Sequence, residues 1–191
     1  MPILILNGSP RTKGLLATTL ATMRQELESR GKAVTWVDVY SLNMKPCLAC
    51  MQCRPDGTCA LPHDDAHLVG DMLRESTGLI LGSPTHWGNM SAMLKLLLDR
   101  NVPAVMGAKP NGMPLGRHKG QPAALVATCT TPRPFHLLPS QGRGAIRAMK
   151  TIIQTGGWNL KGSLILPGTR TLSAPPANTL AKARTLADKL I

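Results

Sequence analysis

Residues 3–14 read ILILNGSPRTKG, an apolar run followed by a loop rich in glycine and polar side chains. The four aliphatic residues predict a short strand that is buried on both faces. The glycines permit tight turns, and the N–H groups at the start of the helix that follows form an anion site. Hydroxyl and cationic side chains fill the loop, so we expect it to hold a phosphate group through Ser9, Arg11, Thr12, Lys13 and Gly14. An ordinary strand-to-helix turn with solvent-exposed cations fits the same residues.

The loop matches neither of two common nucleotide-binding patterns. It lacks the Walker A spacing G-x-x-x-x-G-K-[ST] and the dinucleotide fingerprint G-x-G-x-x-G. ATP and a Rossmann-bound NAD are therefore disfavoured as ligands of this loop.

Short apolar runs alternate with longer helical patterns along the rest of the chain. We expect strands at 3–6, 34–39, 78–81, 122–127 and 163–166, and helices at 14–30, 63–76, 89–100, 140–155 and 178–190. Loops without regular structure are expected at 46–62 and 102–120. The pattern shows no hairpin turns, which predicts an α/β fold with a parallel sheet covered by helices on both faces.

The composition predicts one domain spanning residues 1–191. The chain is 43% hydrophobic and 17% charged, and no apolar run reaches the length of a membrane span, so disordered and membrane-spanning classes are excluded. Aromatic residues make up 3%, so the core is expected to consist of Leu, Ile, Val, Met and Ala. The first six residues lack the basic flank and the length of a signal peptide, and a cytoplasmic protein is expected.

Positive charge is concentrated in the second half of the chain. Residues 1–100 carry ten Lys and Arg against nine Asp and Glu, whereas residues 101–191 carry twelve against Asp188 alone. This imbalance favours an anionic partner: a phosphorylated cofactor, an acidic protein or nucleic acid. The basic residues form no consecutive block and have almost no aromatic residues between them, which argues against nucleic acid as the partner.

A second loop, LGSPTHWGNM at residues 81–90, also leads from a strand into a helix. Its residues predict a rigid, flat-walled loop that suits a planar heteroaromatic ring, held by stacking and main-chain hydrogen bonds. Because ligands of parallel sheets lie beyond the carboxyl ends of the strands, we expect both loops to meet at one crevice. A third loop after the fourth strand is expected to contribute as well. The expected ring contacts are Pro84, Thr85, His86, Trp87, Gly88, Asn89, Thr128 and Thr130, with no catalytic side chain among them.

The two loops together carry a family resemblance. Leu6-x-Gly8-Ser9-Pro10-Arg11-x-x-Gly14, followed by Gly82-Ser83-Pro84-x-x-x-Gly88-Asn89-Met90-Ser91-x-x-x-Lys95-x-x-x-Asp99-Arg100, resembles the NADPH-dependent FMN reductase branch of the flavodoxin-like superfamily. The resemblance implies a flavodoxin-like three-layer sandwich with strand order 2-1-3-4-5. It implies FMN, with the phosphate in the first loop and the isoalloxazine ring beside the second. It also implies a homodimer or homotetramer formed through the helix at 91–100.

The sequence departs from this family directly after Gly14. The family usually has small polar residues there that donate to the phosphate, whereas this chain has Leu15 and Leu16. Each missing donor is worth about 1.5–3 kcal/mol toward a charged acceptor. FMN affinity is therefore expected to be lower than is usual for the family, with Arg11, Thr12, Lys13 and Thr18 compensating in part.

Four of the five cysteines form the motif Cys47-x2-Cys50-x2-Cys53-x5-Cys59. Disulfides are disfavoured in the cytosol, and zinc sites usually have two separated C-x2-C pairs. Three thiolates at three-residue steps are closer to the ligands of a 4Fe-4S cluster, and the motif resembles that of iron–sulfur flavoproteins. Free thiols at the flavin edge, zinc and a redox disulfide remain alternatives. Cys129 is expected to be a buried, inert thiol.

These features predict an FMN-containing oxidoreductase that passes a hydride from NAD(P)H to FMN and on to a flavin, quinone or similar acceptor. The alternative is an iron–sulfur flavoprotein that carries electrons with a 4Fe-4S cluster, and a third is a flavin-free module that binds nucleic acid. The phosphates of NADPH are expected to meet an electropositive rim, formed by Lys109, Arg117, His118, Lys119, Arg133, His136, Arg143 and Arg147.

Overall fold

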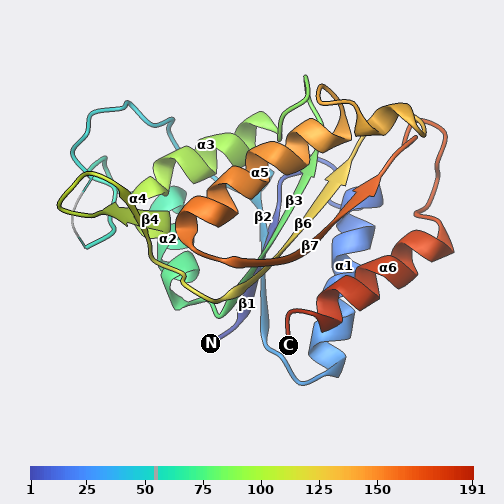
Figure 1. Ribbon diagram of the computed structural model, residues 1–191, viewed down its shortest axis with the longest axis horizontal. Coiled ribbons are helices and arrows are strands. Elements are labelled where there is room, and N and C mark those ends of the chain that lie inside the picture. The colour runs from blue at the N-terminus through green and yellow to red at the C-terminus, as the bar shows by residue number, and fades with distance from the viewer. Residues whose placement is uncertain (54–55) are drawn as a thin grey trace.

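The computed structural model describes residues 1–53 and 56–191. At its centre lies a five-stranded parallel sheet in the order β2-β1-β3-β6-β7, with helices on both faces (Figure 1). Its strands are β1 (Ile3–Asn7), β2 (Val34–Asp38), β3 (Gly78–Pro84), β6 (Pro122–Thr128) and β7 (Asn159–Leu166). The predicted α/β class and the five-stranded parallel sheet are confirmed.

The strand numbering differs from the predicted order 2-1-3-4-5 because two short strands were missed. β4 (Met106–Ala108) and β5 (Pro114–Gly116) form an antiparallel hairpin after the short helix α4 (Val102–Val105). All three lie in the segment 102–120, which was expected to be irregular, and the prediction of a chain without hairpins is wrong. Three-residue strands that contain Gly and Pro show neither the apolar alternation nor the β-branched residues that mark a strand.

Aliphatic runs fill the strands because helices cover both faces of the sheet. In β1, Leu4 and Leu6 belong to the cluster with α2 (Asp65–Glu75), α3 (Ala92–Arg100) and α5 (Gly142–Gly156). Ile3 and Ile5 belong to the opposite cluster with α1 (Leu15–Ser29) and α6 (Ala177–Asp188). Successive strand residues point to opposite faces, so a strand covered on both faces must be apolar throughout.

Two short 3-10 helices, η1 (Val39–Ser41) and η2 (Phe135–Leu137), complete the described elements. None of the helices in the described ranges has the length and apolar character needed to cross a membrane.

Three loops leave the sheet at the same edge and at the same level. Asn7 at the end of β1 lies beside Gly82 of β3, and Pro84 at the end of β3 lies beside Thr128 of β6. The strand order reverses between β1 and β3, because the chain runs from β1 outward to β2 and then crosses back to β3. Open parallel sheets bind ligands at such a point, beyond the carboxyl ends of the strands.

Candidate functional site

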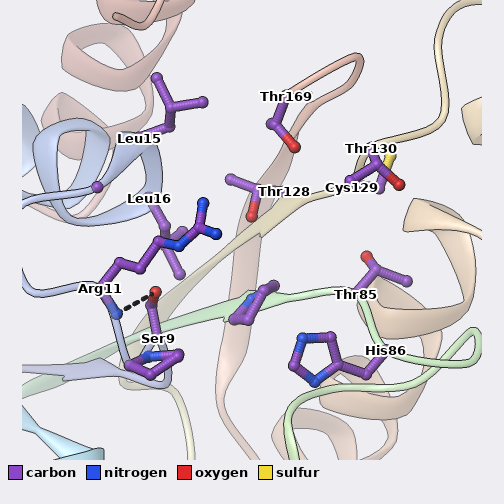
Figure 2. A pocket seen from close by; sticks show the side chains of 13 residues that line it. Ser9, Arg11, Leu15, Leu16, Thr85, His86, Thr128, Cys129, Thr130 and Thr169 are labelled. Carbon is purple, nitrogen blue, oxygen red and sulfur yellow. Dashed lines mark hydrogen bonds between the residues drawn. The ribbon is translucent and has the colours of Figure 1, made fainter. Parts of the chain in front are cut away.

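An open cavity of about 280 Å³ lies between these three loops (Figure 2). Trp87 and Gly88 line a second cavity of about 330 Å³ beside it, whereas Thr12, Lys13 and Asn89 line neither. The loops after β1 and β3 therefore meet in one crevice. The predicted residues that line the first cavity are Ser9, Arg11, Gly14, Pro84, Thr85, His86, Thr128 and Thr130.

Local hydrogen bonds hold the first loop in place. Gly8 N donates to Gly82 O at 2.8 Å, and a Cβ at Gly8 would come within 2.8 Å of the same oxygen. Asn7 Oδ1 accepts from Ser9 N at 3.3 Å, and Ser9 Oγ accepts from Arg11 N at 3.1 Å. Glycine is therefore required where the loop passes β3, and the turn after it is set by side chains of the loop itself.

The amino end of α1 opens onto this cavity. Its N-cap residue, Gly14, has no side chain with which to cap the helix, and the first turn contains no acidic residue. The Arg11 side chain reaches into the space between α1 and Thr128 (Figure 2). The positive end of the helix dipole, the first-turn N–H groups and this guanidinium together make an anion site.

Leu15 and Leu16 form part of the wall and leave the cavity open. Leu16 is buried and Leu15 half-buried, and both line the cavity. Thr18, which was expected to compensate for their missing donors, does not line the cavity, and its hydroxyl donates to Gly14 O at 3.1 Å. Backbone N–H groups and Arg11 are therefore the main donors at this end of the crevice.

The second loop is a tight two-residue turn. His86 N donates to Asn89 O and Asn89 N donates to His86 O, both at 2.9 Å, with Trp87 and Gly88 at positive φ (52° and 70°). This is the geometry of a type I′ turn. Because Asn89 closes the turn, α3 begins at Ala92, three residues after the predicted start of the helix.

Thr85 links the two cavities. It lines both of them, and its backbone N donates to Thr128 O at 2.7 Å. Its Oγ1 is buried and has no hydrogen-bond partner among the described residues. A buried hydroxyl without a partner is costly, so a ligand with a polar edge would stabilise this wall. An anion site at one end and this hydroxyl at the other fit a phosphorylated ring compound.

The four clustered cysteines lie in the loop before α2. Cys47, Cys50 and Cys53 are exposed and Cys59 is half-buried, and all of them are free thiols. Burial, together with the nearby thiols of Cys59, Cys47 and Cys50, raises the pKa of Cys53. Within the described residues, no three His, Cys, Asp or Glu side chains are arranged to hold a metal ion.

Two of these sulfurs already accept hydrogen bonds. Ala49 N donates to Cys47 Sγ and Arg100 Nε donates to Cys59 Sγ, each at 3.4 Å. Soft thiolate ligands select iron–sulfur clusters, zinc and copper(I), and N–H donors to their sulfurs are a regular feature of cluster sites. The donor set therefore fits a cluster by its chemistry.

None of the residues predicted for the electropositive rim lines the two central cavities. Arg143 and Arg147 line a third cavity of about 460 Å³ on α5, together with Lys150, which was missed although it continues their helical spacing. His118 lies elsewhere, buried and stacked on Trp158 with ring centroids 3.9 Å apart. Burial lowers the pKa of His118, which favours a neutral ring, so its place in the rim was wrong.

Two other side chains near the site are also buried. Burial, with the nearby charge of Arg133, lowers the pKa of His136, which lines none of these three cavities. Cys129 is buried as expected, and burial raises the pKa of its thiol. It nevertheless lines both central cavities, whereas the other four cysteines line neither. Thr169, after β7, lines the first cavity, and no sequence pattern indicated it.

Comparisons with known proteins agree with this geometry. The family model for NADPH-dependent FMN reductase matches residues 1–160. An iron-sulfur flavoprotein of Methanocaldococcus jannaschii is 30% identical over 107 residues, covering 56% of this chain and 55% of that relative. The chain spans about half the length of the iron-sulfur flavoproteins that it matches.

Solved structures show the same fold at low sequence identity. The azoreductase AzrA has a TM-score of 0.71 at 15% identity, over 99% of this chain and 100% of that one. RosB, solved with bound 8-demethyl-8-formylriboflavin-5′-phosphate, has a TM-score of 0.74 at 12% identity, over 100% of this chain and 77% of that one. An archaeal flavodoxin also covers the whole chain, and the fold is flavodoxin-like.

Proposed function

The chain belongs to the NADPH-dependent FMN reductase family, and from this premise we propose that it binds FMN and passes a hydride from NAD(P)H to a flavin, quinone or similar acceptor. The observation that carries the proposal is the open cavity between the loops after β1, β3 and β6. One end offers an anion site, and the other offers a buried hydroxyl without a partner among the described residues.

In this proposal the first loop binds the phosphate of FMN. The N–H groups at the start of α1 and the Arg11 guanidinium donate to the phosphate oxygens, while Leu15 and Leu16 form an apolar wall. Pro84, Thr85 and His86 hold the ring, with the Thr85 hydroxyl as a donor at its edge.

Bound FMN supplies the chemistry, since the flavin accepts a hydride and releases electrons singly or in pairs. The protein contributes position and the exclusion of water. We expect no acid or base from the chain to dominate this reaction, and we assign His86 a contact with the ring.

The basic face of α5 supports NAD(P)H as the reductant. Arg143 and Arg147 are exposed, as is Lys150 one turn on, and none of the ion pairs between described residues involves them. Their cavity is lined by Pro139, which is next to Ser140 of the second cavity. Phosphates of a pyridine nucleotide would be attracted to this face, and added salt would weaken the attraction.

The deciding experiment is anaerobic mixing of the FMN-loaded protein with NADPH and, separately, NADH. We expect the flavin absorbance to bleach and a quinone to restore it. A flavin that stays oxidised with both nucleotides would contradict the role of NAD(P)H as reductant. A chain that does not take up FMN at all would contradict the proposal as a whole.

A second candidate is an iron–sulfur flavoprotein that exchanges electrons between a 4Fe-4S cluster and FMN. The four clustered cysteines and the names of the relatives favour it. Cys47, Cys50, Cys53 and Cys59 would hold the cluster, which would supply one-electron transfer. Anaerobic purification should then give about four iron atoms per chain and a broad absorbance beneath the flavin bands. A protein that shows flavin bands but contains no iron after anaerobic reconstitution would contradict this second candidate. The FMN reductase proposal would then stand without a cluster. A homodimer or homotetramer, with a cytoplasmic location, stays a prediction from the sequence.

A further inference from the structure

Arg100, the last residue of α3, is a cation buried beneath the cysteine loop. It is 1% exposed. Its Nη1 donates to Asp64 Oδ2 at 2.7 Å and its Nη2 donates to Asp64 Oδ1 at 3.0 Å, so the two side chains form a bidentate ion pair. Its Nη1 also donates to Lys45 O at 2.7 Å, and its Nε donates to Cys59 Sγ at 3.4 Å. One guanidinium therefore makes four hydrogen bonds.

These bonds tie together the two ends of the cysteine loop. Lys45 lies two residues before Cys47, and Cys59 is the last cysteine of the motif. Asp64 strengthens the same junction, since its Oδ2 also accepts from Lys45 N at 3.1 Å and its Oδ1 caps α2 by accepting from Ala66 N at 3.2 Å. The loop is thus anchored to α2 and α3 at both ends.

Cys59 is held more firmly than the other three cysteines. His67 Nε2 lies 3.1 Å from Cys59 O, and Arg74 Nη1 donates to Gly57 O at 2.7 Å, two residues earlier. Cys59 is half-buried, whereas the other cysteines of the motif are exposed. The loop therefore presents one fixed sulfur and three sulfurs on its exposed part.

Stability alone gives little reason for a buried ion pair here. Removing a guanidinium from water costs several kcal/mol, and apolar residues of similar size are often as stable. A buried ion pair does fix local geometry, because each N–H group of the guanidinium needs an acceptor at a defined position. Here one of those partners is a cysteine sulfur.

The geometry points to Arg100 as a positioning residue for a cluster bound by this loop: it fixes Cys59 as the preset ligand and donates a hydrogen bond to its sulfur. The inference rests on the second function proposed above. Hydrogen bonds to ligand sulfurs raise the reduction potential of a cluster, because they stabilise its more negative, reduced form. Groups that orient metal ligands typically contribute about 10–100-fold to metal affinity.

The test compares Arg100→Lys with Arg74→Lys after anaerobic reconstitution with iron and sulfide. Lysine at 100 keeps a positive charge beside Asp64 but cannot reach Asp64, Lys45 O and Cys59 Sγ together. Arg74 anchors the same loop through Gly57 O and its bonds involve no sulfur, so it is the matched control. The readouts are the rate of iron loss to a chelator and the midpoint potential of the cluster.

We expect Arg100→Lys to lose iron about tenfold faster or more and to have a lower midpoint potential. Arg74→Lys loosens the same loop but removes no bond to a sulfur, so its midpoint potential should stay at the wild-type value. Equal rates and potentials in wild type and Arg100→Lys would overturn the role of Arg100 and leave the cluster proposal intact. Wild-type chain that takes up no iron would instead overturn the cluster proposal, and with it this inference.

A second variant guards against misfolding of Arg100→Lys. Asp64→Ser/Arg100→Met removes both buried charges, while serine can still cap α2. This variant should bind FMN as wild type does, which reports the fold, and should lose iron at least as fast as Arg100→Lys. Wild-type iron retention and potential in this double variant would also overturn the role of Arg100.

Discussion

Arg11 and Lys13 provide a matched pair for testing the phosphate site. Both are exposed cations of the loop between β1 and α1, two residues apart. Arg11 lines the cavity at the amino end of α1, and Lys13 does not. Substituting each by alanine removes the same charge from the same loop. The two variants therefore distinguish direct contact with the phosphate from long-range electrostatic attraction between the loop and the phosphate.

The structure sets the size of the expected effect. A hydrogen bond from a guanidinium to a charged acceptor is worth about 1.5–3 kcal/mol. Because Arg11 is exposed, solvent screening places the effect at the lower end, near 1.5 kcal/mol. That energy corresponds to roughly a tenfold rise in the Kd for FMN. Arg11→Ala should therefore bind FMN about tenfold more weakly, and Lys13→Ala should change the Kd by less than about threefold.

The assay is a titration of apoprotein into FMN, followed by quenching of flavin fluorescence. Riboflavin is the control ligand because it has the same ring and no phosphate. Arg11→Ala should leave the Kd for riboflavin unchanged. Equal losses of FMN affinity in the two variants, or an equal loss of riboflavin affinity in Arg11→Ala, would refute the assignment of Arg11 to the phosphate.

Three further predictions concern other parts of the site and its supports. Leu15→Asn places a side-chain donor at the cavity wall and should lower the Kd for FMN by up to about tenfold in the same titration. Weaker binding of FMN would count against a phosphate site at the amino end of α1. Gly144→Ala would bring a methyl group within 2.1 Å of Gly88 O, so urea unfolding should show a loss of about 1–3 kcal/mol, and unchanged stability would contradict this close contact. Burial raises the pKa of Asp64, but hydrogen bonds from Arg100 and from Lys45 N outweigh it and hold this pKa below the ordinary value of 3.8. The unfolded chain thus takes up this proton first, and the associated stability is present above pH 4 and is lost as the pH falls through the folded pKa. Asp64→Asn should flatten the dependence of unfolding free energy on pH below 4, and an unchanged slope would exclude Asp64 as its source.

The crevice could be predicted from sequence because its parts are local. The run before Asn7 is apolar for four residues, which is typical of a strand covered on both faces, and a glycine-rich loop follows it directly. The sequence predicts a strand, a loop and a helix in that order. Because parallel sheets bind ligands beyond the carboxyl ends of their strands, this order places the loop at the site. The same steps located the loop after β3.

Features set by distant residues could not be predicted in this way. Arg100 meets Cys59 and Asp64 across 41 and 36 residues, and no local pattern links them. His118 resembled a rim residue beside its basic neighbours, but packing against Trp158 buries it. The turn at His86–Asn89 shortened α3 because backbone pairing overrode the helical spacing of the apolar residues.

The most direct measurement is a ¹H–¹⁵N correlation spectrum of the apoprotein during titration with FMN. Amide signals of Ser9, Gly14, Leu15, Leu16 and Thr85 should shift together and saturate at one FMN per chain. Signals of residues 31–33, which precede β2 at the opposite end of the sheet, should stay in place (Figure 1). Shifts confined to other elements, or none at all, would contradict a flavin site at the carboxyl ends of β1 and β3.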